Sequence, residues 1–146
     1  FINKAASSHT GNIELTIPSQ KNDFSKLPFY ASQLSSVNET HAVKHLPNLI
    51  TEKIDVPTTT LDEIVKDYSI EEIELLHTDT EGHDYDIIMN YSFNVKPFKI
   101  LFEHKHMDGY FKTGIRYDTL KNKLNSLGYK LKFRNSEDTL VQLSNL

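Results

Sequence analysis

The sequence predicts an α/β domain with a mostly parallel sheet that ends in an antiparallel hairpin. Between residues 54 and 128, short apolar runs alternate with segments of helical periodicity, which is the order of strand–helix units in a parallel sheet. Residues 129–133 and 139–143 follow each other across a turn, as the strands of a hairpin do. The chain has 146 residues, 38% of them hydrophobic, which is enough for one domain with a packed core.

Composition excludes several classes of protein. The chain contains no cysteine, so it has neither disulfides nor a thiolate zinc site nor a cysteine nucleophile. Its longest apolar runs are three or four residues, far short of the roughly 18 that a membrane-spanning helix needs. Both features agree with a cytoplasmic protein that has no membrane partner. The chain starts at Phe1 with neither a Met nor a signal peptide, so we interpret it as a piece of a longer or processed protein.

The net charge of −4 is unevenly distributed along the chain. Residues 1–60 carry five Lys and five acidic residues, residues 61–90 one Lys and ten acidic residues, and residues 91–146 ten basic and five acidic residues. The basic residues form no concentrated patch, so we expect no nucleic-acid partner. The acidic middle segment is either a solvated helix face or a source of carboxylates for a site.

The first 50 residues show little regular patterning. Residues 1–6 are compatible with a strand that runs into a loop. Ile13, Leu15 and Ile17 alternate with polar residues, which predicts a short, half-buried strand. The Ser, Asn, Lys and Pro content of residues 18–48 predicts a long surface insertion, and loops of this length are usually functional or poorly ordered.

The first strand–helix unit follows a short helix. Thr60 and Glu63 have the spacing of a capping box, so we expect this helix to start at residue 61. Residues 73–76 form a near-continuous apolar run, as expected for a strand that is buried on both faces. Gly82 then separates this strand from a second helix, which has acidic residues in its first turn.

A second unit and the hairpin complete the domain. Residues 98–102 are a further apolar strand. A loop leads to a helix with apolar residues at helical spacing up to Leu127, and Gly128 follows it in the position of a C-terminal cap. Residues 129–133 alternate strictly between apolar and polar side chains, and residues 139–143 form the last short strand.

Polar residues follow both parallel strands, at the sheet edge where ligands bind in open α/β folds. Asp79 and Glu81 follow the first strand, and Glu103, His104 and His106 follow the second. Because alternate side chains of an extended segment share a face, we expect Asp79 to pair with Glu81 and His104 with His106. Neighbouring strands would bring these groups together, either to bind a divalent metal or to supply a general base.

The remaining polar residues have simpler interpretations. We interpret Asp84 and Asp86 as residues that start a helix. His9, His41 and His45 lie in sequence typical of loops, and we expect them to be exposed and uninvolved in function. With Gly only at positions 11, 82, 109, 114 and 128, the chain contains neither a dinucleotide-binding nor a phosphate-binding glycine motif, and it contains no nucleophile elbow.

Three segments of the sequence resemble the FkbM-type S-adenosylmethionine-dependent methyltransferases. They are a Thr-Leu-Asp helix start within residues 56–64, a strand ending in Asp-Thr-Glu-Gly within residues 73–84, and a following strand ending in an acidic residue within residues 100–104. The resemblance covers residues 54–143 well and residues 1–20 loosely. The chain departs from the family at His77, where the family has Lys, and at Thr78, where it has Ile.

The resemblance implies a Rossmann-like class I methyltransferase sheet, of which this chain is the carboxy-terminal part. The family's first strand with its glycine-rich loop, and the acidic end of its second strand, have no counterpart here. The first βαβ unit is therefore expected to be missing, and residues 1–6 correspond to the third strand of that fold. Residues 18–48 remain a surface insertion within a single partial domain.

The resemblance also implies an activity, the transfer of a methyl group from S-adenosylmethionine to a hydroxyl of a sugar or small natural product. Asp79 and Glu81 are the candidates for orienting the acceptor or acting as general base, with His104 as a second candidate base. Ala6 and Ser7, with Asp79, are the candidates for contacting the cofactor. This interpretation assigns no metal.

Two alternatives to the methyltransferase hypothesis remain open. Asp79, Glu81, His104 and His106 are also a ligand set for a metal-dependent hydrolase. Alternatively, a methyltransferase-like sheet without catalytic activity presents residues 18–48 to a partner. Because the central first strand of the methyltransferase sheet is expected to be missing, the strand at 73–78 lacks a neighbour on one side, so we expect the chain to form a homodimer.

Overall fold

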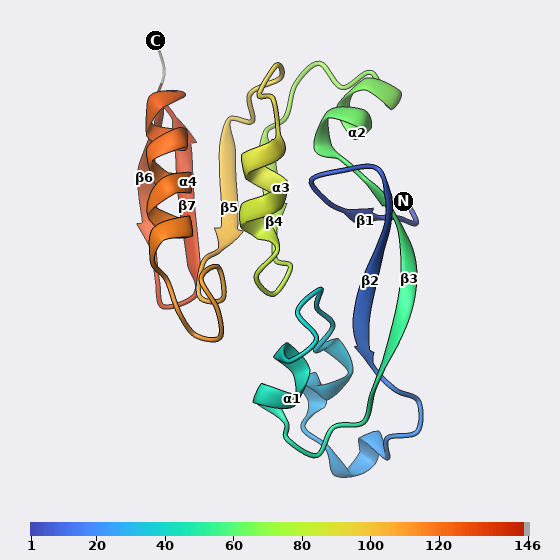
Figure 1. Ribbon diagram of the computed structural model, residues 1–146. Helices are drawn as coiled ribbons and strands as arrows, with labels where there is room; N and C mark the ends of the chain where they lie inside the picture. The colour runs from blue at the N-terminus through green and yellow to red at the C-terminus, as the bar shows by residue number, and fades with distance from the viewer. Residues whose placement is uncertain (145–146) are drawn as a thin grey trace.

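The computed structural model describes residues 1–144 and contains two sheets with helices (Figure 1). One sheet has three strands in the order β1-β3-β2, and the other has four in the order β4-β5-β7-β6. The chain is thus a mixed α/β protein, as the sequence predicts. The pairs β1–β3 and β4–β5 are parallel, whereas β2–β3, β5–β7 and β6–β7 are antiparallel. The C-terminal hairpin forms where it was expected, but residues 1–144 do not form the single, mostly parallel sheet that the sequence predicts.

The four-stranded sheet carries the main core. Its strands are β4 (Leu75–Thr78), β5 (Lys99–Glu103), β6 (Tyr129–Arg134) and β7 (Asp138–Leu143). The helices α3 (Asp84–Asn90) and α4 (Ile115–Ser126) cover one face of this sheet (Figure 1). Alternation places Ile100 and Phe102 of β5 on that face, where both are buried with Leu120 and Leu124 of α4.

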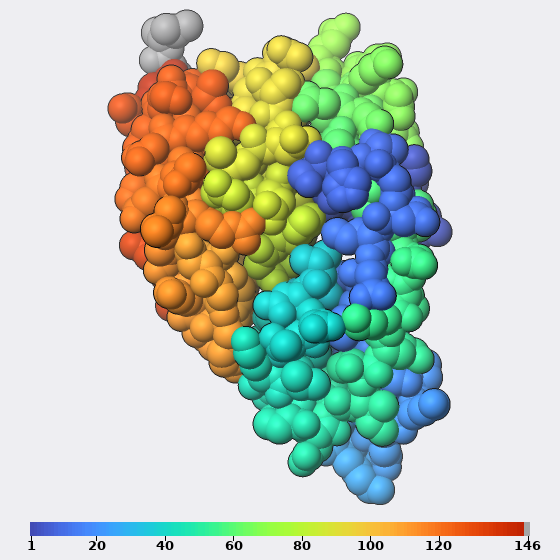
Figure 2. Space-filling model, viewed as in Figure 1, coloured from blue at the N-terminus to red at the C-terminus, as the bar shows by residue number. Residues whose placement is uncertain are grey.

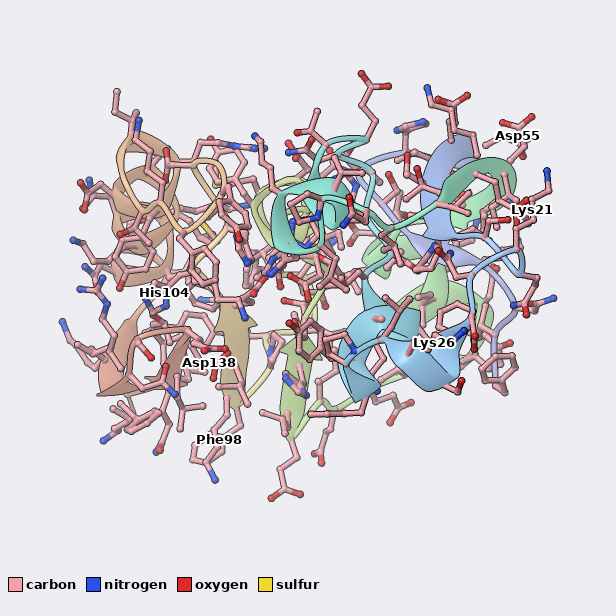
Figure 3. The ribbon with its side chains drawn as sticks, turned by 90° about the horizontal axis from the view of Figure 1, so that it is seen from below. Lys21, Lys26, Asp55, Phe98, His104 and Asp138 are labelled. Atoms are coloured by element: carbon pink, nitrogen blue, oxygen red, sulfur yellow. The ribbon has the colours of Figure 1, made fainter. Side chains whose placement is uncertain are left out.

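The opposite face of the same sheet is open. Leu75 is 50% exposed, and Phe98 points away from the helices (Figure 3). The prediction that the strand at 73–76 is buried on both faces is therefore wrong. Its apolar residues have neighbours on one face only, because among residues 1–144 no helix packs against the other.

The three-stranded sheet consists of β1 (Ala5–Ala6), β2 (Gly11–Pro18) and β3 (Thr51–Thr59). The strand β3 lies in the middle and was not anticipated, because charged residues and Pro57 interrupt its alternation. The helix α2 (Leu61–Asp67) follows β3 directly. The capping box at its start is confirmed, because the Thr60 side chain accepts from the N–H of Glu63 and the Glu63 side chain accepts from the N–H of Thr60.

The segment between β2 and β3 is folded. It contains two short 3₁₀ helices, η1 (Phe24–Lys26) and η2 (Phe29–Gln33), and the helix α1 (His41–His45). A small apolar core of its own holds it together, formed by Ala31, Leu34, Ala42 and Leu49. This segment reaches across to the loop after β5 (Figure 2). There the Tyr110 hydroxyl donates to the carbonyl of Lys44 at 3.2 Å. No helix in residues 1–144 is long and apolar enough to cross a membrane.

Candidate functional site

Two loops build the candidate site, one after β4 and one after β5. In the parallel register Thr78 is opposite Phe102, so the chain leaves both strands at the same edge. Asp79, Glu81 and Glu103 each offer a carboxylate oxygen, and these oxygens lie within 4.8 Å of one another. The predicted pairing of Asp79 with Glu81 is thus present in the structure, and Glu103 from the neighbouring strand joins it.

The loop after β4 has a backbone conformation that explains part of its sequence. Gly82 has a φ of +101°, and a Cβ at this position would lie 3.0 Å from the carbonyl oxygen of His106. Glycine is required there because any side chain would be strained and would meet the backbone of the second loop. The fully buried Asp84 accepts hydrogen bonds from the N–H of Thr80 at 3.2 Å and from its hydroxyl at 2.7 Å, which closes the loop onto the start of α3.

Burial and mutual repulsion shift the pKa values of the three carboxyl groups apart. Burial and the charge of Glu81 raise the pKa of Glu103 to about 8, although the Lys105 ammonium lies 3.2 Å away. Partial desolvation and the charges of Glu81 and Asp84 raise the pKa of Asp79. The His41 imidazole lowers the pKa of Glu81. Glu81 is therefore the most acidic group of the set, and Asp79 is a stronger base than an ordinary aspartate.

Glu81 also belongs to a second cluster, which it forms with three imidazoles. His41 and His45 come from α1, and His106 comes from the loop after β5. The ring centroids are 4.6 Å apart for His41–His45, 4.8 Å for His41–His106 and 5.3 Å for His45–His106. His41 is 2% exposed and His106 is 4% exposed. The prediction that His41 and His45 are exposed is therefore wrong, because His41 is buried and His45 is partly buried.

Four polar atoms of this cluster have no hydrogen-bond partner among residues 1–144. They are the Nε2 atoms of the three histidines and Oε2 of Glu81, all shielded from solvent. Nε2 of His41 lies 3.1 Å from Oε2 of Glu81, and Nε2 of His106 lies 3.6 Å from it. Burial lowers the pKa of His45 and brings that of His106 to about 4, so both rings are neutral at pH 7.

His104 belongs to a different environment from His106. Thr139 contacts Nδ1 of His104 at 3.0 Å, Arg134 donates to its Nε2 at 3.4 Å, and the ring packs 5.1 Å from that of Tyr117. The expectation that His104 and His106 share a face fails because β5 ends at Glu103 and the chain turns immediately. The ligand set of the hydrolase hypothesis is thus not assembled.

Two adjoining cavities lie next to these groups. The larger, of about 430 Å³, is polar, and its lining includes His41, Glu81, Asp86, His106 and Arg116. Two of these lining residues, Arg116 and Asp86, form an ion pair with each other. The smaller, of about 210 Å³, is lined mostly by apolar side chains: Ala5, Ala6, Ile13, Leu15 and Val37. His83 and Val37 line both cavities and separate them.

The two candidate cofactor contacts near the N-terminus lie close to this boundary. Ala6 lines the smaller cavity. Ser7 is buried, and its hydroxyl is 3.2 Å from Nε2 of His83. Asp79 is exposed and lines neither cavity. It belongs to the site because its carboxylate lies next to those of Glu81 and Glu103.

Sequence reasoning missed the contribution of α1. The signal was present, because His41 and His45 are spaced by four residues, which places two imidazoles on one helix face. What the sequence did not show is that the segment folds back onto the loops after β4 and β5. A hydrogen bond from the Ser36 hydroxyl to the Glu81 carbonyl, at 3.1 Å, fixes this approach.

Comparison with known families gives one match. The sequence model of the methyltransferase FkbM domain matches residues 2–131, which include both loops of the site. No curated protein and no solved structure matches the chain at a significant level. The family match covers most of the chain, and the protein is therefore a member of the FkbM methyltransferase family.

Proposed function

We propose that this chain is the carboxy-terminal part of a class I, S-adenosylmethionine-dependent O-methyltransferase that acts on a hydroxyl of a sugar or small natural product. The observation that carries this proposal is the polar cavity beside Glu81, at the edge where the parallel strands β4 and β5 end. Its lining of carboxylates, imidazoles and a guanidinium suits a ligand with several hydroxyl groups.

The residues present fit one part of the cofactor. The smaller, apolar cavity at Ala5 and Ala6 suits the planar adenine ring, and its position beside His83 connects it to the larger cavity. The chain supplies neither a glycine-rich loop nor an acidic strand end for the ribose. In our proposal these come from a first βαβ unit whose strands pair with the free edges of β1 and β4, which completes a Rossmann-like sheet.

The cofactor, when bound, supplies an electrophilic methyl group, and the protein has to align the acceptor oxygen and take its proton. Asp79 is the proposed general base, because its raised pKa makes it a stronger proton acceptor than Glu81, whose pKa is lowered. Glu81, which lines the cavity, orients the acceptor hydroxyl. His104 receives no role, because its two ring nitrogens already contact Thr139 and Arg134.

Calorimetric titration with S-adenosylhomocysteine tests the proposal. In the longer protein that contains this chain, we expect one binding site, lost in Ala6→Trp because the indole fills the adenine cavity. Glu14→Trp, on the exposed side of β2, is the matched control and should bind normally. Absence of binding to the longer wild-type protein, or equal binding by Ala6→Trp with an intact fold, would contradict the proposal.

A further inference from the structure

We propose that the chain contains a site for one divalent transition-metal ion of the zinc type, with His41, His45 and Glu81 as ligands and His106 as a positioning residue for Glu81. The site shares Glu81 with the acidic group that also contains Asp79 and Glu103, and its test does not depend on methyl transfer. It rests on the cluster of unpartnered, buried atoms that face one another between α1 and the loops after β4 and β5.

The first argument is that buried polar atoms without partners are costly. Such an atom costs about 1–3 kcal/mol when no hydrogen bond replaces its contact with water. Nε2 of His41, Nε2 of His45 and Oε2 of Glu81 are all of this kind, and they lie within one small volume. A bound cation would satisfy all three at once.

The second argument is geometric. Two ligand atoms on a tetrahedral zinc ion are about 3.3 Å apart, given bond lengths of about 2.0–2.1 Å. Nε2 of His41 and Oε2 of Glu81 are 3.1 Å apart, yet no hydrogen bond with acceptable angles joins them. This spacing is therefore compatible with one ion bound to both atoms.

The ligand types and their spacing agree with this assignment. Two histidines four residues apart on a helix, together with one carboxylate from another segment, are a recurrent zinc ligand set. Imidazole ligands favour zinc and its transition-metal neighbours, whereas Mg²⁺ and Ca²⁺ prefer oxygen ligands alone. Three protein ligands leave a coordination position for water or for a ligand in the adjoining cavity, which His41 and Glu81 line.

His106 has a different role because its Nδ1 accepts the N–H of Phe111 at 3.1 Å. The neutral ring therefore carries its proton on Nε2, which cannot bind a metal in that form but can donate to a carboxylate. Nε2 lies 3.6 Å from Oε2 of Glu81, so a small adjustment makes this hydrogen bond. His106 thus holds Glu81 in place, as outer partners of metal-binding carboxylates commonly do.

The test is zinc titration of the EDTA-treated, dialysed 146-residue chain, with a chromophoric chelator as competitor. We expect one zinc ion per chain, and a tetrahedral visible spectrum when Co²⁺ replaces zinc. His41→Ala and His45→Ala should each lower the affinity by at least 100-fold. His9→Ala removes an exposed histidine outside the cluster and should bind as the wild type does. Circular dichroism verifies the fold of each variant.

Two further variants test the role of His106. His106→Gln keeps a donor near the position of Nε2 and should retain one zinc ion with affinity lowered no more than about 10- to 100-fold. His106→Ala should bind less tightly than His106→Gln. Less than 0.1 zinc ion bound per wild-type chain, or unchanged affinity in both His41→Ala and His45→Ala, would overturn the site. Loss of zinc in His106→Gln as complete as in His41→Ala would overturn the positioning role.

Discussion

Gly82 and the carbonyl oxygen of His106 approach so closely that a Cβ on Gly82 would lie 3.0 Å from that oxygen. This contact joins the loop after β4 to the loop after β5, and it brings Glu81 beside His106. The backbone of the two loops therefore sets the geometry of the site.

Gly82→Ala should lower the free energy of unfolding by about 2–3 kcal/mol, because it adds a backbone clash to the strain of a positive φ. Gly109→Ala is the matched control, since Gly109 has a φ of +119° but a Cβ there would meet no other atom within 4 Å. It should cost only about 1–2 kcal/mol. Urea denaturation measures both values, and equal losses would show that the contact with His106 is unimportant.

Glu103→Gln should stabilise the protein above neutral pH. Glu103 is 2% exposed, and its pKa is raised from 4.5 to about 8. The folded state thus binds more protons than the unfolded state between these pH values, so wild-type stability falls as pH rises from 4.5 to 8. At pH 8 we expect the variant to gain on the order of 2 kcal/mol.

Thermal unfolding across pH 5–9, in the presence of EDTA, measures this difference. Glu137→Gln is the control, because Glu137 contacts the same Lys105 from a half-exposed position and should show little of this pH dependence. A wild-type protein whose stability relative to Glu103→Gln is constant from pH 5 to 8 would rule out the raised pKa.

Asp79→Asn should lower methyl transfer by at least 100-fold in the protein with its complete cofactor site, because the amide cannot accept the acceptor's proton. The melting temperature should change little, since Asp79 is exposed. Asp67→Asn, an exposed aspartate at the end of α2, serves as control. Near-normal turnover of Asp79→Asn would remove the assigned role.

The free edge of β4 leads to a prediction about association. In the part of the chain that the structure describes, β4 pairs with β5 on one side only, and Leu75 of β4 is half exposed. We expect two copies of the chain to associate through this edge at high concentration. Leu75→Lys should shift the mass measured by light scattering from that of two chains to that of one. A wild-type mass of one chain at high concentration would contradict the prediction.

Local patterns in the sequence were sufficient for several elements. The capping box at Thr60 and Glu63, the helix that ends before Gly128 and the C-terminal hairpin depend on interactions within a few residues or on simple alternation. The carboxylate pair Asp79 and Glu81 was likewise predictable, because it follows directly from the end of a strand.

The imidazole cluster was decided by the tertiary structure alone. His41 and His45 meet Glu81 and His106 only because the segment between β2 and β3 folds around its own apolar core and docks on the two loops. His104 and His106 are separated because the chain turns after Glu103 and ends the strand alternation. Such contacts depend on residues far apart in the chain, whereas the spacing of neighbouring residues reports only on local conformation.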